Sequence, residues 1–128
     1  MRKKNHKTIL VLEDEIPLLY AVMEKLQVDG YSVLGVRTVK EALAFIQNRQ
    51  AVDAIWLYHY LLGEQSGLDF VNVLRQNRFL EKTPIFVVSN TASADKIEKY
   101  QALGIKKYFT KANHNLKEII KDIEKSLK

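Results

Sequence analysis

Residues 8–15 read TILVLEDE, a short run of aliphatic and β-branched residues that ends in three acids. A short apolar run without polar alternation is typical of a strand buried on both faces of a sheet. The next segment, 15–28, carries apolar residues at helical spacing, and its Pro17 fits the first turn of a helix, where a missing backbone N–H is tolerated. The N-terminal part of the chain therefore predicts a buried strand that leads directly into an amphipathic helix.

The same alternation of strand and helix continues to the end of the chain. Further strands are predicted at 31–36, 53–57, 84–89 and 106–110, and helices are predicted after a Thr38 cap and at 68–79, 92–103 and 116–127. Five strands that alternate with five helices, (βα)5, predict an α/β fold with a parallel sheet covered on both faces. We expect a doubly wound, flavodoxin-like sheet of five strands in the order 2-1-3-4-5.

The composition limits the classes of protein to which the chain can belong. Its 128 residues suit one domain, and the absence of cysteine excludes a disulfide scaffold and thiolate metal sites. The longest apolar runs are far shorter than the roughly 20 residues that span a bilayer. No GxGxxG or P-loop signature points to a nucleotide-binding enzyme. We therefore expect a soluble, cytoplasmic protein with no membrane partner.

Charge is distributed unevenly along the chain, whose net charge is +5. Residues 2–7 carry four bases and no acid, whereas residues 8–95 carry seven bases and eleven acids. We divide the chain into a basic N-terminal tail, 1–7, and one domain, 8–128. Basic tails can bind nucleic acid, but no aromatic residue interleaves these bases and no DNA-binding motif is present. Nucleic acid is therefore not the expected partner of this domain alone.

Polar side chains stand where the predicted strands end. Glu13 and Asp14 follow the first strand, Tyr58 follows the third, Ser89 ends the fourth, and Lys111 follows the fifth. In a doubly wound sheet these ends meet at one edge, where ligands bind. Carboxylates suit a hard divalent cation, whereas a hydroxyl and an ammonium group donate to anionic oxygens. Each residue alone also has an ordinary structural explanation, such as acids that favour a helix N-terminus or a solvated lysine, so the prediction depends on their convergence.

Over residues 8–127, the order of these features resembles the response-regulator receiver domains of two-component systems, including the chemotaxis regulators. Several short motifs at the spacing of that family carry the resemblance. They are Glu13-Asp14, the strand DAIWL at 53–57, Gly67, Ser89 followed by Asn90-Thr91-Ala92, Ala102-Leu103-Gly104, and Lys111 three residues after the aromatic residue at position 108.

The resemblance implies a signalling domain rather than an enzyme. Such a domain accepts a phosphoryl group from the phosphohistidine of a sensor histidine kinase or of a phosphotransfer protein. The resemblance further implies that Glu13, Asp14 and the backbone carbonyl of Tyr60 ligate Mg²⁺. Ser89 and Lys111 would bind the phosphoryl group.

A conformational switch is also implied by the resemblance. Ser89 would move toward the phosphoryl group, and Tyr108 would change rotamer with it. The surface formed by the fourth helix, the fifth strand and the fifth helix would then bind a downstream protein.

The chain departs from the family at the residue that follows the third strand. The phosphoacceptor position holds Tyr58 in place of aspartate. A phenol with a pKa near 10 is neutral at pH 7, and it is neither a good nucleophile nor a strong magnesium ligand. Asp53, at the opposite end of the strand, and Glu64, on the following loop, do not substitute for the missing acid. We therefore predict that position 58 is not phosphorylated, and that Mg²⁺ binding is weakened because only two carboxylates remain.

Several alternatives remain open from the sequence. Tyr58 is either natural or introduced; its ring fills the crevice, leans over Ser89 or points to solvent; and it either mimics or blocks the active state. A pseudo-receiver that binds partners independently of phosphorylation is the second functional hypothesis.

The chain also departs from the family at two other places. Ala112 stands where the family usually has proline, and the loop 61–67 is one residue longer than usual. His59 is expected to border the site in an exposed position.

Overall fold

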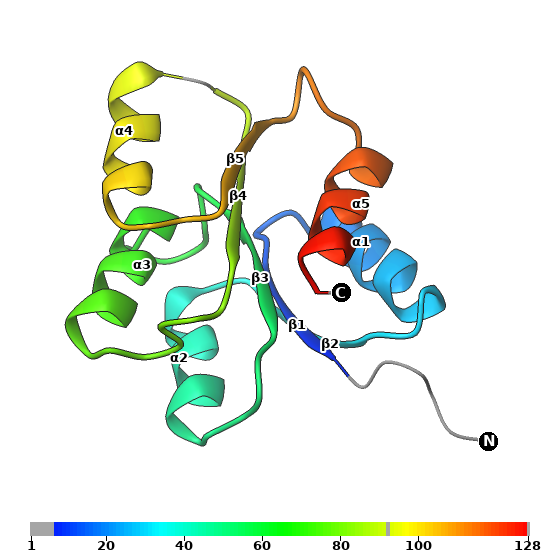
Figure 1. Cartoon of the computed structure of the whole chain (residues 1–128), viewed down its shortest axis with the longest axis horizontal. Coiled ribbons are helices and arrows are strands. Elements are labelled where there is room, and N and C mark those ends of the chain that lie inside the picture. Colours follow the sequence, from blue (N-terminus) through cyan, green and yellow to red (C-terminus); the bar gives the residue numbers. More distant parts are fainter. Residues whose placement is uncertain (1–6, 92, 128) are drawn as a thin grey trace.

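A computed structural model describes residues 7–91 and 93–127 of the chain. It shows a central sheet with helices on both of its faces (Figure 1). Six of the seven residues assigned above to a basic N-terminal tail lie outside the described residues, so that assignment stays a prediction.

The sheet has five parallel strands in the order β2-β1-β3-β4-β5, which confirms the predicted fold class and strand order. The strands are β1 (Thr8–Leu12), β2 (Ser32–Val36), β3 (Ala54–Tyr58), β4 (Ile85–Ser89) and β5 (Lys107–Thr110). The helices are α1 (Ile16–Val28), α2 (Val39–Gln47), α3 (Gly67–Gln76), α4 (Ala94–Ala102) and α5 (Leu116–Ser126). Within the described part of the chain, no helix is long and apolar enough to cross a bilayer.

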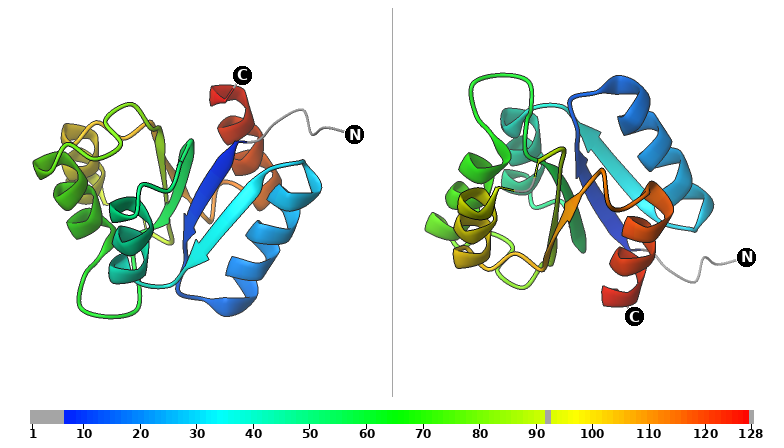
Figure 2. Two further views of the ribbon diagram at one scale, coloured as in Figure 1. Left: turned by 90° about the horizontal axis from the view of Figure 1, so that it is seen from below. Right: turned by 90° about the horizontal axis from the view of Figure 1, so that it is seen from above.

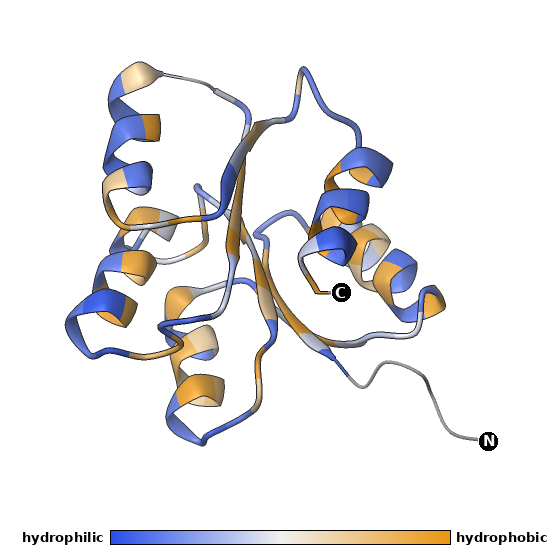
Figure 3. Cartoon of the chain, viewed as in Figure 1, coloured by the Kyte–Doolittle hydropathy of each residue, from blue (hydrophilic) through white to orange (hydrophobic). Residues whose placement is uncertain are grey.

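The helices form two layers around the sheet. Helices α1 and α5 cover one face, and α2, α3 and α4 cover the other (Figures 1 and 2). Because side chains alternate along a strand, the core is split in two: Leu10 and Ile55 pack toward α2, α3 and α4, whereas Val11 and Trp56 pack toward α1 and α5. Figure 3 shows apolar strands between helices that are each part apolar and part polar. This pattern is what a helix needs to cover a sheet with one side and face water with the other.

Side-chain caps set the starts of four helices. Thr38, Ser66 and Asn115 each form a capping box at the start of α2, α3 and α5, which confirms the Thr38 cap. Ser93 accepts a hydrogen bond from a backbone N–H of the first turn of α4. That helix therefore begins at Ala94, two residues later than predicted.

The helix predicted at 68–79 is too long. It ends at Gln76, because Arg78 and Leu80 adopt positive φ angles of 57° and 51°, which a right-handed helix cannot include. Phe79 and Leu80 extend the apolar pattern of the sequence, but they pack against the core from a turn. Periodicity alone does not distinguish an apolar residue on a helix from one on the turn that follows it.

Gly67, the first residue of α3, is packed too closely for a side chain. A Cβ atom there would lie 2.7 Å from the Tyr100 hydroxyl and 3.2 Å from the Cα of His59. We predict that Gly67→Ala lowers the free energy of unfolding by about 1–3 kcal/mol, the usual cost of overpacking, as measured by urea denaturation. Gly35→Ala on β2 is the matched control, since a Cβ there would meet the flexible side chains of Met23 and Leu19. A cost for Gly67→Ala no larger than that of the control would show that the packing is looser than the structure indicates.

Candidate functional site

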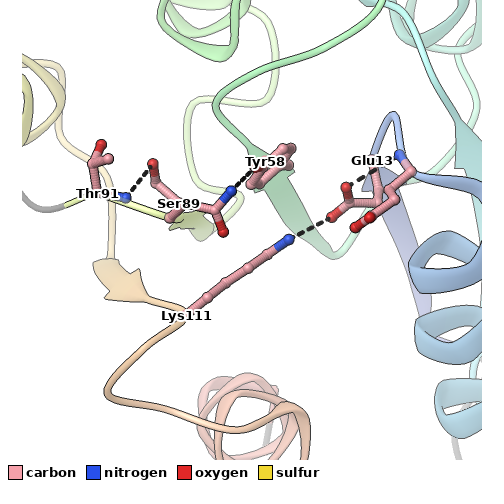
Figure 4. A network of polar contacts seen from close by, with 7 residues as sticks. Glu13, Tyr58, Ser89, Thr91 and Lys111 are labelled. Carbon is pink, nitrogen blue, oxygen red and sulfur yellow. Dashed lines mark hydrogen bonds and ion pairs between the residues drawn. The ribbon is translucent and has the colours of Figure 1, made fainter.

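The carboxyl ends of the strands bring together most of the residues predicted for the site. Glu13 directly follows β1, Tyr58 and Ser89 end β3 and β4, and Lys111 directly follows β5. Figure 4 shows the Lys111 side chain reaching from the loop after β5 toward Glu13 and Tyr58. The Lys111 Nζ atom lies 3.9 Å from Glu13 Oε1 and 4.0 Å from the centre of the Tyr58 ring. A carboxyl group, an aromatic face and one ammonium group thus share a single crevice.

Glu13 is a fully buried carboxyl group. Its Oε2 accepts a hydrogen bond from the backbone N–H of Glu15 at 3.3 Å, whereas its Oε1 has no hydrogen-bond partner among the described residues. Burial raises the pKa of Glu13 to about 7, and the nearby Lys111 ammonium opposes this rise. Near neutral pH this side chain is therefore poised between its neutral and its charged form.

Lys111 holds its charge between two partners. At 3.9 Å its contact with Glu13 is longer than a hydrogen bond. Its position over the Tyr58 ring is that of a cation–π contact, which contributes about 0.5–2 kcal/mol depending on desolvation. Among the described residues no peptide bond is cis, so the bond between Lys111 and Ala112 is trans.

The Tyr58 ring lies inside the site rather than in solvent. It is 6% exposed, and its hydroxyl accepts a hydrogen bond from Asn90 Nδ2 at 2.7 Å. Burial, with the nearby Glu13 carboxyl as the next cause, raises the pKa of Tyr58 to about 12. The phenol is therefore neutral at physiological pH, and the orientation that the sequence left open is a buried one.

Ser89 and Tyr108, the two residues predicted to act as a switch, are joined through Thr91. Ser89 is fully buried, and its hydroxyl accepts a hydrogen bond from the Thr91 backbone N–H at 3.3 Å. The half-buried Tyr108 donates from its hydroxyl to the Thr91 carbonyl at 2.8 Å. The strand end at Ser89 and the surface at Tyr108 are thus linked by a short polar chain.

Arg37 borders the site, although none of the family motifs found in the sequence includes it. The Arg37 guanidinium donates to the Asp14 carbonyl from Nε at 3.0 Å and from one terminal nitrogen at 2.7 Å. The Arg37 carbonyl in turn accepts from the Leu62 backbone N–H at 3.1 Å. Arg37 therefore ties the loops after β1, β2 and β3 together. Its place directly after β2 is the signal in the sequence that could have identified it.

His59 and Tyr60, the two residues that follow β3, have side-chain contacts with α4. Tyr60 is 49% exposed, and its hydroxyl accepts from Lys96 Nζ on α4 at 3.1 Å, so its side chain lies toward α4. His59 was predicted to be exposed, and this is wrong: it is half-buried, with Nδ1 2.6 Å from the Tyr100 hydroxyl. Burial, followed by the positive charge of Lys96, lowers the pKa of His59. The reason is the close packing of α3 and α4 above this loop, which the sequence alone does not reveal.

A hard divalent cation fits the donor atoms of this edge. Glu13 Oε1 is a buried oxygen without a hydrogen-bond partner among the described residues, and the Asp14 carboxylate follows it directly. Oxygen donors of this kind are the ligands that Mg²⁺ prefers. No group of three or more histidine, cysteine or acidic side chains suited to a metal occurs in the part of the chain that the structure describes. The donor set is therefore a pair of carboxyl groups rather than a triad.

Comparisons with known proteins agree with this geometry. A family model described as the response regulator receiver domain matches residues 9–124. Over 107 residues the chain is 31% identical to the phosphate regulon transcriptional regulatory protein PhoB of Pseudomonas aeruginosa, a match that covers 82% of this chain and 45% of that protein. The chain thus spans less than half the length of the curated relative that it matches.

Solved structures share the same fold. Chemotaxis protein CheY4 of Vibrio cholerae superposes with a TM-score of 0.83 at 25% identity, covering 94% of this chain and 98% of that one. A CheY-like receiver domain protein from Methanospirillum hungatei JF-1 gives a TM-score of 0.85 at 22% identity, covering 96% and 94% of the two chains. The family match spans nearly the whole domain, and the strand order and the convergent edge of the sheet agree with it. The chain therefore belongs to the response regulator receiver domain family.

Proposed function

We propose that this chain is a receiver domain of a two-component phosphorelay in which position 58 is not phosphorylated. Receiver domains are signalling modules rather than enzymes in general. One observation carries the proposal: a buried, neutral Tyr58 ends β3 at the edge where Glu13, Ser89 and Lys111 converge. A phenol held neutral by burial is a poor nucleophile and a poor metal ligand, so the position lacks the carboxylate that the family's reaction consumes.

In this proposal the remaining residues keep the roles of the family. Glu13, Asp14 and the backbone carbonyl of Tyr60 would hold Mg²⁺, which neutralises negative charge at the site when it is bound. Its affinity would be low, because a third carboxylate is missing and Glu13 binds a proton near neutral pH. Ser89 and Lys111 would face a phosphoryl group at position 58 if an acceptor were restored there.

The proposed partners follow from the same assignment. A sensor histidine kinase or a phosphotransfer protein would dock at the carboxyl edge of the sheet. A downstream protein would bind the surface of α4, β5 and α5, and the domain would work in the cytoplasm. The second hypothesis, a pseudo-receiver that binds partners independently of phosphorylation, is favoured by one contact. Lys111, whose charge would otherwise meet a phosphoryl group, already lies against Tyr58 and Glu13.

We predict that acetyl phosphate and Mg²⁺ leave the mass of the unaltered chain unchanged, as measured by intact mass spectrometry. Tyr58→Asp restores the carboxylate and is expected to yield an acyl phosphate adduct that depends on Mg²⁺ and is labile in both acid and base. Tyr58→Phe is the control, because it removes the hydroxyl without supplying an acceptor, and it should give no adduct. A Mg²⁺-dependent adduct on Tyr58 in the unaltered chain would overturn the proposal. Partner binding by the Tyr58→Asp chain that ignores beryllofluoride would favour the pseudo-receiver.

The buried carboxyl of Glu13 generates a prediction about stability and pH. Its pKa rises from a usual value of 4.5 to about 7 on folding. Its favourable contribution to the free energy of unfolding is therefore complete below about pH 4.5 and is lost as pH rises through about 7. Glu13→Gln resembles the protonated form, so at pH 8 it should be more stable than the unaltered chain by about 1–3 kcal/mol. At pH 4 the difference should nearly vanish. Urea denaturation at both pH values measures this, with the exposed Glu64→Gln as the control. An equal effect of Glu13→Gln at both pH values would refute the assignment.

A further inference from the structure

Helix α4 is held to the domain differently from the other helices. Helices α1, α2, α3 and α5 each bury three or more residues, whereas Tyr100 is the only buried residue of α4 among those described. Apolar burial is the main force that fixes a helix on a sheet. The position of α4 therefore depends unusually strongly on the contacts of one tyrosine.

Tyr100 makes its polar contact with the residue that directly follows Tyr58. The His59 Nδ1 atom lies 2.6 Å from the Tyr100 hydroxyl, and the two rings meet edge to face with centroids 5.6 Å apart. Burial lowers the pKa of His59 and raises that of Tyr100, so both groups are neutral at pH 7. The tautomer of the imidazole sets which of the two groups donates. Tyr100 is fully buried, so the loss of this bond would leave its hydroxyl unpaired in the interior.

The backbone of His59 is itself firmly placed. Its N–H donates to the Val88 carbonyl on β4 at 3.2 Å, and its carbonyl accepts from the N–H of Gly67 at the start of α3 at 2.8 Å. The Tyr100 hydroxyl is packed so closely over Gly67 that no side chain fits there. His59 therefore presents its imidazole to α4 from a fixed point at the edge of the sheet.

On its other side, Tyr100 faces the proposed signalling surface. Its ring packs against Tyr108 of β5 with centroids 5.9 Å apart. Tyr108 donates to the Thr91 carbonyl, and Lys96 of α4 donates to the Thr91 hydroxyl at 2.8 Å. A shift of α4 would therefore change the surroundings of Tyr108 and of Thr91 together.

We propose that His59 is the positioning residue of α4, so that its hydrogen bond with Tyr100 couples the segment after Tyr58 to the α4-β5-α5 surface. This coupling uses neither a phosphoryl group nor movement of Ser89. It goes beyond the proposed function, and it would hold whether or not position 58 accepts a phosphoryl group.

Hydrogen–deuterium exchange of the full chain, read by mass spectrometry, tests the proposal. Tyr100→Phe keeps the ring and removes the hydroxyl. At pH 7.5 it should accelerate exchange of residues 94–102 roughly tenfold or more, as expected for an unpaired buried group, and leave α1 and α5 unchanged. Tyr108→Phe is the matched control, since it removes a tyrosine hydroxyl bond from the same surface and should leave α4 within about twofold of the unaltered chain. Uniform acceleration across the domain, no acceleration in α4, or an equal response to the control would each overturn the proposal.

A second variant tests the role of His59 itself. His59→Phe keeps a ring and removes the nitrogen that pairs with the Tyr100 hydroxyl. At pH 7.5 it should accelerate exchange of residues 94–102 about as much as Tyr100→Phe and leave α1 and α5 unchanged. Exchange of α4 in His59→Phe that matches the unaltered chain would overturn the role of His59.

Discussion

Parallel pairing of all five strands is the constraint on which the rest of the structure depends. It forces every strand to end at the same edge, so residues from four distant parts of the chain meet there without any direct connection. It also requires a crossover between successive strands, here a helix each time; with α5 these helices cover both faces and leave β1, β3 and β4 fully buried. The site is therefore a consequence of topology before it is a consequence of any single residue.

The electrostatics of that edge follow from burial. A fully buried Glu13 needs a counter-charge, and Lys111 supplies it from 3.9 Å while its ammonium rests over the Tyr58 ring. A second carboxylate at position 58 would compete with Glu13 for the same cation, and a neutral phenol does not. Tyr58 therefore fits the crevice both electrostatically and sterically.

Polar contacts contribute strongly to the position of helix α4, because Tyr100 is its one buried residue among those described. Helix α4 is held through its last turn by the contact of Tyr100 with His59. At its C-terminal end Arg75 donates to the Leu103 carbonyl at 2.6 Å. Such contacts are directional, and they weaken when one partner moves. This is the physical basis of the coupling proposed between α4 and the loop after β3.

The sequence by itself determined the fold class, the order of the strands, and which residues reach the carboxyl edge, because hydrophobic periodicity and parallel topology are read directly from the pattern of residue types. It identified Glu13, Ser89 and Lys111 as neighbours and Tyr58 as the residue out of pattern. It placed the end of α3 too late, because Phe79 and Leu80 are equally apolar on a helix or on a turn. Only the tertiary structure decided that the Tyr58 ring is buried, that Arg37 ties three loops together, and that His59 pairs with Tyr100. These three outcomes depend on distances between side chains from separate elements, and spacing along the chain carries no information about such distances.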